Sequence, residues 1–384
     1  MCMATSEQQT VKQMSVPSVR VRIAGFVTTI QVILLAVHWF VYQTWAFFQP
    51  ETDSAGLRVA VAILSVSFVG ASLLAFRYWN LWVRAFYRIA AVWLGFLNFF
   101  FVAACASWVV YPATLLAGLR VGRGDIATAT FGLAALAGIY GLVNAHWPRV
   151  KRIRVKLPNL PEEWRGRVAA VVSDVHLGHV NGTGFVRRIV GKLQKLRPDV
   201  IFLPGDLFDG TKVDLEKVAA PWKELSPRFG MYFVTGNHEE FSDRTKYLQA
   251  VSGSGIRVLN NEKITVNGLQ VVGVHDSDAA DAEEFRSVLE SAGVDRERAS
   301  ILLSHVPRGL GIAEKAGISL QVSGHTHGGQ IFPFTWFTRR IFREYTYGLH
   351  QFGKLQIYTT CGTGTWGPPM RVGTRPEIVM LEFE

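Results

Sequence analysis

The chain has 384 residues, enough for two or three domains of ordinary size. Hydrophobic residues make up 49% of the sequence and charged residues only 18%, so part of the chain is not expected to face water. The net charge is +10, and the three cysteines, Cys2, Cys105 and Cys361, are too widely separated to indicate a disulfide framework or a cysteine-based zinc site.

Four long runs in the N-terminal part contain no Asp, Glu, Lys or Arg: residues 23–50, 59–76, 89–119 and 126–148. Each run is near or above the length of about 18 to 20 residues that crosses a bilayer as a helix. The alternative, buried helices of a large soluble domain, would leave no amphipathic helix to cover them. The sequence therefore predicts four transmembrane helices within residues 23–148, after an N-terminal segment of residues 1–22.

Basic residues in the short loops predict the orientation of these helices. They gather in the N-terminal segment, in the second loop and after the fourth run, at Lys12, Arg20, Arg22, Arg77, Arg84, Arg88, Arg149, Lys151, Arg152, Arg154 and Lys156. By the positive-inside rule, both termini and the C-terminal part of the chain are expected in the cytoplasm. The last five of these residues begin a predicted linker, residues 149–166, and are typical of contact with anionic lipid rather than with nucleic acid.

Residues 167–384 alternate short apolar runs with helical patterns. Residues 185–196 have the spacing of one helical face, and Asn267-Gly268 predicts a hairpin between the runs that flank it. The runs that indicate buried strands are Val168–Val172, Val200–Leu203, Met231–Val234, Ile301–Leu303 and Leu320–Val322. This pattern predicts an α/β domain built on mixed sheets.

Each of these five runs is followed by polar side chains that suit metal binding or catalysis. In chain order they are Asp174 and His176, Asp206 and Asp209, Asn237, His238 and Glu239, His305, and His325 and His327. Because α/β folds place their ligand crevice at the ends of strands, we expect these side chains to meet at one edge of a sheet. Carboxylate, amide and imidazole ligands without thiolate suit Mn, Fe, Zn or Co better than Ca. The set is too large for one tetrahedral zinc and fits two adjacent divalent ions that share a carboxylate.

The motifs resemble, in order and spacing, the signature of the calcineurin-like metallophosphoesterases, over roughly residues 165–384. They are Asp174-x-His176, Gly205-Asp206-x-x-Asp209, Gly236-Asn237-His238-Glu239, His305 and Gly324-His325-x-His327. With its apolar N-terminal region, the chain is similar to the membrane-anchored subgroup, the transmembrane proteins with a metallophosphoesterase domain. The resemblance implies a four-layer sandwich in which two mixed sheets lie between helices.

Carried over by motif, the resemblance also implies roles for the site residues. The two ions would share Asp206, and their ligands would be, for one ion, Asp174, His176, Asp206 and His327 and, for the other, Asp206, Asn237, His305 and His325. His238 would be the catalytic residue that stabilises the phosphoryl group or protonates the leaving oxygen. Asp209 is expected either to orient a neighbouring side chain or to belong to ordinary loop structure. Arg371, which follows the glycine-rich stretch 362–367, is expected to contact the substrate.

The stretch 331–352 interleaves aromatic residues with Arg339, Arg340 and Arg343. This composition suits either a membrane interface and a phospholipid substrate or a loop packed on its own sheet. The whole pattern predicts a metal-dependent phosphoric ester hydrolase, anchored in the cell membrane, that cleaves a phosphodiester or pyrophosphate bond of a lipid-linked substrate. A nucleotide phosphodiesterase or nuclease is the alternative with the same chemistry. A non-catalytic membrane receptor or scaffold is the alternative of another class.

Overall fold

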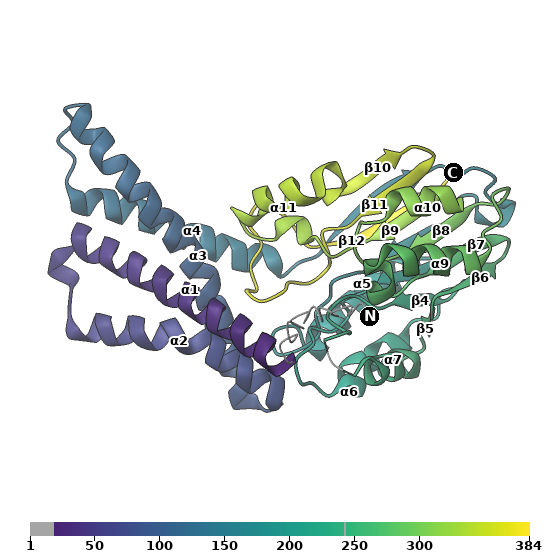
Figure 1. Cartoon of the computed structure of the whole chain (residues 1–384), viewed down its shortest axis with the longest axis horizontal. Helices are drawn as coiled ribbons and strands as arrows, with labels where there is room; N and C mark the ends of the chain where they lie inside the picture. Colours follow the sequence, from purple (N-terminus) through teal and green to yellow (C-terminus); the bar gives the residue numbers. More distant parts are fainter. Residues whose placement is uncertain (1–18, 242) are drawn as a thin grey trace, which may run out of the picture.

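The computed structural model describes residues 19–241 and 243–384, so most of the N-terminal segment 1–22 lies outside the described residues. The chain has two parts, a group of long helices and a β-sandwich, which lie side by side along its longest axis (Figure 1). The long helices are α1 (Val19–Phe48), α2 (Ala55–Arg77), α3 (Leu81–Leu116) and α4 (Arg123–Ala145). All four are long and apolar enough to cross a membrane, which confirms the predicted transmembrane helices.

Capping residues in the short loops explain where two of these helices begin. Ser54 accepts a hydrogen bond from the backbone N–H of Leu57 at the start of α2, and Asn80 accepts one from Val83 at the start of α3. The short 3₁₀ helix η1 (Pro50–Thr52) lies in the first connection. Because the connections are short, consecutive helices are antiparallel neighbours.

Two six-stranded sheets form the centre of the sandwich. The first has the order β1-β12-β2-β3-β4-β5, with the bounds Arg149–Val155, Glu377–Phe383, Val168–Val171, Val200–Pro204, Met231–Val234 and Arg257–Val258. The second has the order β10-β11-β9-β8-β7-β6, with the bounds Gly348–Phe352, Leu355–Thr359, Leu320–Ser323, Ser300–Leu303, Leu269–Gly273 and Glu262–Val266. Both sheets mix parallel and antiparallel pairs, and β6 and β7 form the predicted hairpin.

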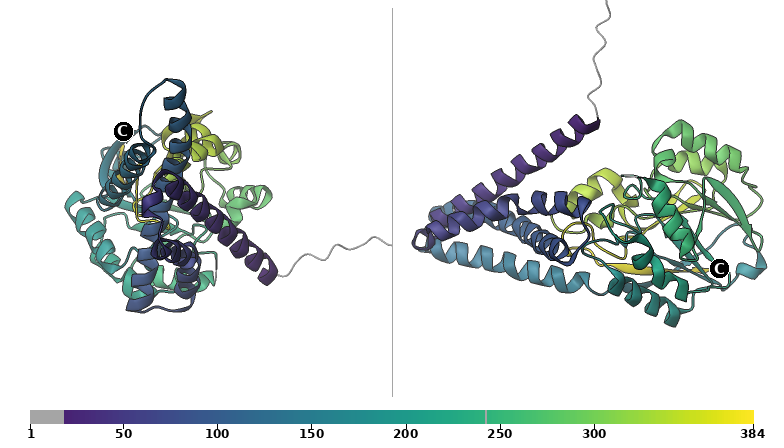
Figure 2. Two further views of the ribbon diagram at one scale, coloured as in Figure 1. Left: turned by 90° about the vertical axis from the view of Figure 1, so that its left-hand side faces the viewer. Right: turned by 90° about the horizontal axis from the view of Figure 1, so that it is seen from below.

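Helices cover the outer faces of both sheets, so the sandwich has the four predicted layers (Figure 2). One apolar cluster lies between the sheets and includes Phe202 of the first and Leu303 of the second. A second cluster joins the first sheet to α5 (Thr183–Leu196), α6 (Leu215–Ala219), η3 (Ala220–Glu224) and α7 (Arg244–Gly253). A third joins the second sheet to α9 (Ala282–Ala292) and α10 (Leu310–Ala316), with the short α8 (Asp276–Ala280) before them.

Residues 149–166, which were expected to form a basic linker, contain a strand of the first sheet and a 3₁₀ helix. The first half of this segment is β1, which pairs in parallel with β12, and the 3₁₀ helix η2 (Glu162–Trp164) follows. Arg152 forms an ion pair with Glu382, at 2.7 Å, and Arg154 forms one with Glu384, at 3.3 Å. Part of the basic cluster therefore faces carboxylates of the adjacent C-terminal strand rather than lipid.

The sandwich packs directly against the long helices. Met370 and Ile331 belong to the same apolar cluster as Phe48, Phe99 and Phe131 of the helices. Asn144 of α4 donates hydrogen bonds to the backbone carbonyls of Arg371 and Thr374, both at 2.9 Å. The loop 366–374 of the sandwich is therefore held against α3 and α4.

Candidate metal centre

The predicted site residues lie together, but they come from two sheets rather than from one sheet edge. Asp174, Asp206 and Asn237 follow β2, β3 and β4 of the first sheet, and His305 and His325 follow β8 and β9 of the second. The sheets pack face to face with the carboxyl ends of these strands at the same end of the sandwich. The loops of both sheets therefore meet there.

Five of the site residues have left-handed backbone conformations. The φ angles are 54° at Asp174, 50° at His176, 52° at Asp206, 68° at His325 and 48° at His327. This region is uncommon for residues other than glycine, and such residues concentrate at functional sites. The loops are thus bent so that each side chain turns toward the space between the sheets.

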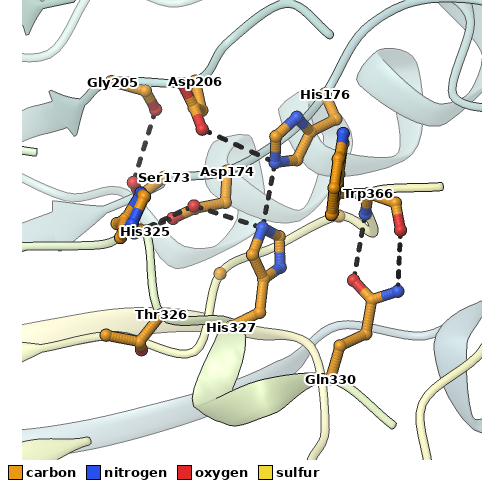
Figure 3. Close-up of polar contacts among 12 residues, drawn as sticks. Ser173, Asp174, His176, Gly205, Asp206, His325, Thr326, His327, Gln330 and Trp366 are labelled. Carbon is orange, nitrogen blue, oxygen red and sulfur yellow. Dashed lines mark hydrogen bonds and ion pairs between the residues drawn. The ribbon is translucent and has the colours of Figure 1, made fainter. Parts of the chain in front are cut away.

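The first cluster consists of Asp174, His176 and His327 (Figure 3). The Nε2 atoms of the two histidines are 2.9 Å apart, and His327 Nε2 lies 3.4 Å from Asp174 Oδ1. All three residues are buried, and burial keeps the pKa of both histidines well below its ordinary value. Neutral imidazoles beside a carboxylate are the ligand set that borderline divalent ions prefer.

The second cluster consists of Asp206, His305 and His325, with Asn237 beside them. His305 Nε2 lies 3.1 Å from Asp206 Oδ2, and Asn237 Oδ1 lies 3.0 Å from His325 Nδ1. His305 Nδ1 donates to the carbonyl of Pro204 at 2.8 Å, which leaves Nε2 to face the Asp206 carboxylate. Nε2 is buried and has no hydrogen-bond partner, so its lone pair and the carboxylate need a cation between them.

A proton can take that place when no metal is bound. Burial alone would lower the pKa of His305, but the facing Asp206 carboxylate outweighs it and raises the pKa to about 10. Metal binding at this cluster would therefore release a proton from His305. This dependence is typical of a histidine that serves as a metal ligand.

Asp206 connects the two clusters. Its Oδ2 atom lies 3.8 Å from His176 Nε2 as well as 3.1 Å from His305 Nε2. One carboxylate within reach of both groups suits the shared ligand of a dinuclear centre. The described residues therefore fit two divalent ions. The one exception is the protonation of the His327 ring, in which the nitrogen that faces the site carries the proton.

The exception arises from Arg371, which is fully buried behind His327. Its guanidinium donates to the backbone carbonyls of His327, at 2.9 Å, and Gly364, at 2.6 Å, and lies 3.1 Å from His327 Nδ1. Because a guanidinium only donates, His327 Nδ1 accepts and the proton of this imidazole lies on Nε2. An ion bound at Nε2 would require that proton to move. These contacts suit a residue that positions His327, whereas the predicted contact of Arg371 with substrate stays a prediction.

His238 lies next to Asp206 with one ring nitrogen fixed. Its Nδ1 donates to the backbone carbonyl of Asp209 at 2.8 Å, and its Nε2 lies 4.0 Å from Asp206 Oδ2. The backbone of Asp209 thus orients His238, while its carboxylate accepts from Thr211. His176, Asp206 and His238 also form a third group that could hold an ion, so the geometry alone permits His238 as a ligand too.

Glu239 has a supporting role that sequence reasoning left open. Its buried carboxylate accepts hydrogen bonds from the backbone N–H groups of Asp206, at 3.0 Å, Phe208, at 2.8 Å, and Gly236, at 2.8 Å. It thereby joins the loops that carry Asp206 and Asn237. The sequence indicates a role for Glu239 only through its position directly after His238. That position does not predict which backbone N–H groups bind its carboxylate.

Aromatic side chains form the rim of the site. The rings of Phe241 and Trp366 lie 4.6 Å and 5.8 Å from the ring of His238, and each residue is 57% exposed. Gln330 holds the backbone of Trp366 through hydrogen bonds in both directions, each 2.9 Å long (Figure 3). Exposed aromatic surface therefore lies beside His238 at an otherwise polar centre.

Comparisons with known proteins agree with this geometry. Residues 168–329 match the model of the calcineurin-like phosphoesterase family. A transmembrane protein with metallophosphoesterase domain from Danio rerio is 31% identical over 76% of this chain and 71% of its own length. An uncharacterised metallophosphoesterase of Aquifex aeolicus is 32% identical over 66% of this chain and 98% of its own length.

Among solved structures, a dimetal phosphatase from Danio rerio aligns with 57% of this chain and 100% of its own, at 12% identity and a TM-score of 0.36, a likeness too low to support any argument. The sequence relatives and the family match carry the assignment instead. The chain belongs to the calcineurin-like metallophosphoesterases, and it is a membrane protein and a metal-dependent phosphoester hydrolase of that family.

Proposed function

We propose that the chain hydrolyses a phosphodiester or pyrophosphate bond of a lipid-linked substrate. The observation that carries the proposal is the position of the metal centre at the end of the sandwich that contacts the membrane helices. His179, three residues after His176, is within hydrogen-bond distance of the backbone carbonyl of Tyr78, in the loop between α2 and α3, at 3.1 Å. A phosphoester group carried by a bilayer lipid would meet the site close to where it resides.

The proposed ligand sets follow the two clusters. Asp206 would be shared, with Asp174, His176 and His327 on one side and Asn237, His305 and His325 on the other. When bound, two divalent ions would supply an activated water and offset negative charge on the phosphate. Mn, Fe, Zn and Co all suit these ligands.

We assign the proton transfer to His238. With Nδ1–H committed to the Asp209 carbonyl, Nε2 is the atom that faces the site and can hold a proton. A proton on Nε2 would pass to the leaving oxygen as its bond to phosphorus breaks. Trp366 and Phe241, whose rings both lie near that of His238, would exclude water from the leaving group and pack against its apolar part.

A nucleotide phosphodiesterase is a second candidate, and the same rim favours it. A nucleobase could stack on Trp366, which is 57% exposed and lies beside His176 and His238 at the site (Figure 3). The two candidates differ in the released product. A screen of lipid pyrophosphates, nucleotide-linked lipids and cyclic nucleotides would identify which phosphate is released.

The full-length protein in detergent tests the assignment with a chromogenic phosphodiester and a measurement of bound metal. We expect Asp206→Asn to lower both metal content and hydrolysis, the latter by about 100-fold or more, because both ions lose a ligand. His238→Ala should lower hydrolysis by about 100-fold while metal content stays at the level of the unmodified protein.

Asp281→Asn provides a matched control, because, among the described residues, the side chain of this exposed N-cap bonds only to the backbone of Glu283 and Glu284 in α9 and asparagine caps a helix equally well. It should keep full activity. Loss of metal in His238→Ala would instead make His238 a ligand, and full hydrolysis by Asp206→Asn would refute the dinuclear assignment.

A further inference from the structure

The helix α11 (Phe334–Phe342) has an apolar stripe that no other described part of the chain covers. Phe334, Phe337 and Ile341 recur at helical spacing and are 55%, 49% and 72% exposed. The residues that turn toward the sandwich, Thr335 and Thr338 among them, are only half-buried. A helix with this pattern needs an apolar partner for its outer face.

The polar side of α11 and the turn after it are basic. Arg339 and Arg340 lie in the last turn of the helix and Arg343 follows it, and none of the three forms an ion pair with a carboxylate in the described part of the chain. The guanidinium of Arg340 instead lies over the ring of Trp336, 5.8 Å from its centroid. The exposed apolar stripe suits the acyl chains of a bilayer, and the unpaired arginines beside it suit its anionic headgroups.

The position of α11 relative to the membrane helices places it at the level of that surface. The helix α4 has 23 residues, close to the about 20 that cross the hydrocarbon core, so its last turn lies at a membrane boundary. The last two turns of α4 contact the loop 370–374, through the carbonyl of Gly141 and the side chain of Asn144. Asn98 of α3 donates to the carbonyl of Phe332 at 2.9 Å, two residues before α11 begins. In Figure 1, α11 lies at the end of the sandwich nearest the long helices.

The same helix is tied to the metal centre. Thr326, between the ligands His325 and His327, donates from its hydroxyl to the carbonyl of Thr346 at 2.8 Å, in the turn after α11. The ring of Phe342 lies 6.0 Å from that of His325. The mouth of the metal centre therefore lies next to α11.

We infer that α11 lies in the membrane surface, with Phe334, Phe337 and Ile341 among the acyl chains and the three arginines on anionic headgroups. This contact would hold the mouth of the metal centre at the depth of lipid phosphoester groups. The delivery of substrate from the bilayer rests on the proposed function, whereas the docking of α11 on the bilayer does not.

A depth measurement in nanodiscs tests the docking without any need for activity. The full chain, with Cys2→Ala and Cys105→Ala, would carry Ile341→Cys labelled with an environment-sensitive fluorophore, in bilayers of phosphatidylcholine and phosphatidylglycerol. We expect lipids with nitroxides near the headgroup to quench this label at least about twofold more than the same label at Ser291→Cys. Ser291 is an exposed residue of α9, in the helical layer over the second sheet.

Equal quenching at the two positions would overturn the inference. Cross-linking between copies of Ile341→Cys without quenching would overturn it as well, because the stripe would then face a second copy of the chain. Replacing all three arginines by glutamine should reduce the quenching and its dependence on phosphatidylglycerol. Hydrolysis of the chromogenic phosphodiester by the same samples in detergent reports separately on the proposed function.

Discussion

At the scale of single residues, the position of Asp206 depends on the carboxylate of Glu239, which belongs to neither proposed ligand set. Glu239 accepts three backbone N–H groups within the two loops that carry Asp206 and Asn237. We expect Glu239→Gln to turn one amide NH₂ toward these donors and to lower the free energy of unfolding by about 1–3 kcal/mol. Because the Asp206 loop loosens, metal affinity should fall by about 10-fold or more. Thermal unfolding and metal titration of the purified variant measure both effects.

Glu284→Gln is the matched control, since Glu284 is exposed in the first turn of α9 and its carboxylate faces solvent. It should leave metal affinity unchanged. If Glu239→Gln lowered stability without any change in metal affinity, Glu239 would be a structural residue only.

The residues nearest the proposed ions could be predicted from sequence because each follows an apolar run that ends at the site. A single carboxylate such as Asp206 would more often belong to a turn, so the prediction depends on the repetition of this pattern at five runs. The supporting residues could not be predicted, because a buried carboxylate such as Glu239 or a buried guanidinium such as Arg371 acts through backbone groups from distant segments. Arg371 donates to the carbonyls of His327 and Gly364, which no sequence pattern indicates, and its contact with substrate stays a prediction.

At the scale of elements, the long helix α3 holds the loop that follows His176. Arg88 donates from Nε to the carbonyl of His179, at 2.9 Å, and from Nη2 to that of Val180, at 2.7 Å. Arg84 also donates to the carbonyl of His179, at 3.3 Å. A membrane helix therefore supports one of the metal-binding loops.

Arg88→Ala should weaken this support. The carbonyl of Val180 loses its arginine donor and that of His179 keeps only Arg84, so we expect metal affinity and the rate of phosphodiester hydrolysis to fall together by about 10-fold. Arg88→Lys should recover part of both, because one ammonium can reach one carbonyl but not hold both. Arg58→Ala, at an exposed ion pair with Asp53 in the first loop, is the control and should change neither quantity. Unchanged metal affinity in Arg88→Ala would show that the contact serves only to join the two parts of the chain.

The strands and long helices were predictable from hydrophobic runs, and the elements that were not predictable have mixed patterns. The strand β1 consists largely of basic residues, and its pairing with β12 joins positions 149 and 377, so no local signal indicates it. The helix α11 combines aromatic and basic residues, a pattern that both an interfacial helix and a loop can have. Pairing between distant segments decides β1, and the proposed contact with a bilayer would explain the pattern of α11.

At the scale of the whole molecule, the two parts share one apolar cluster, so the side of the membrane that holds the metal centre is set by the orientation of the four helices. On the side of the sandwich lie Arg77, Arg84 and Arg88 and the four basic residues of β1. On the opposite side lie Arg120, Arg58, which forms an ion pair with Asp53 at 3.6 Å, and Arg123, which lies over the ring of Phe47 near Asp125. The excess of basic residues on the sandwich side favours a cytoplasmic catalytic domain.

This orientation predicts the result of a protease-protection experiment on intact cells. A tag after Glu384 should be protected from external protease, because it follows β12 of the sandwich, whereas a tag inserted in the loop 118–122 between α3 and α4 should be cleaved. Both tags should be cleaved after detergent has permeabilised the membrane. This control shows that the protease can cut each tag when no membrane protects it. Cleavage of the C-terminal tag in intact cells, with protection of the loop tag, would place the metal centre outside. A substrate in the outer leaflet or beyond would then be required, because the contacts of α3 and α4 with the sandwich keep the metal centre on one side of the membrane.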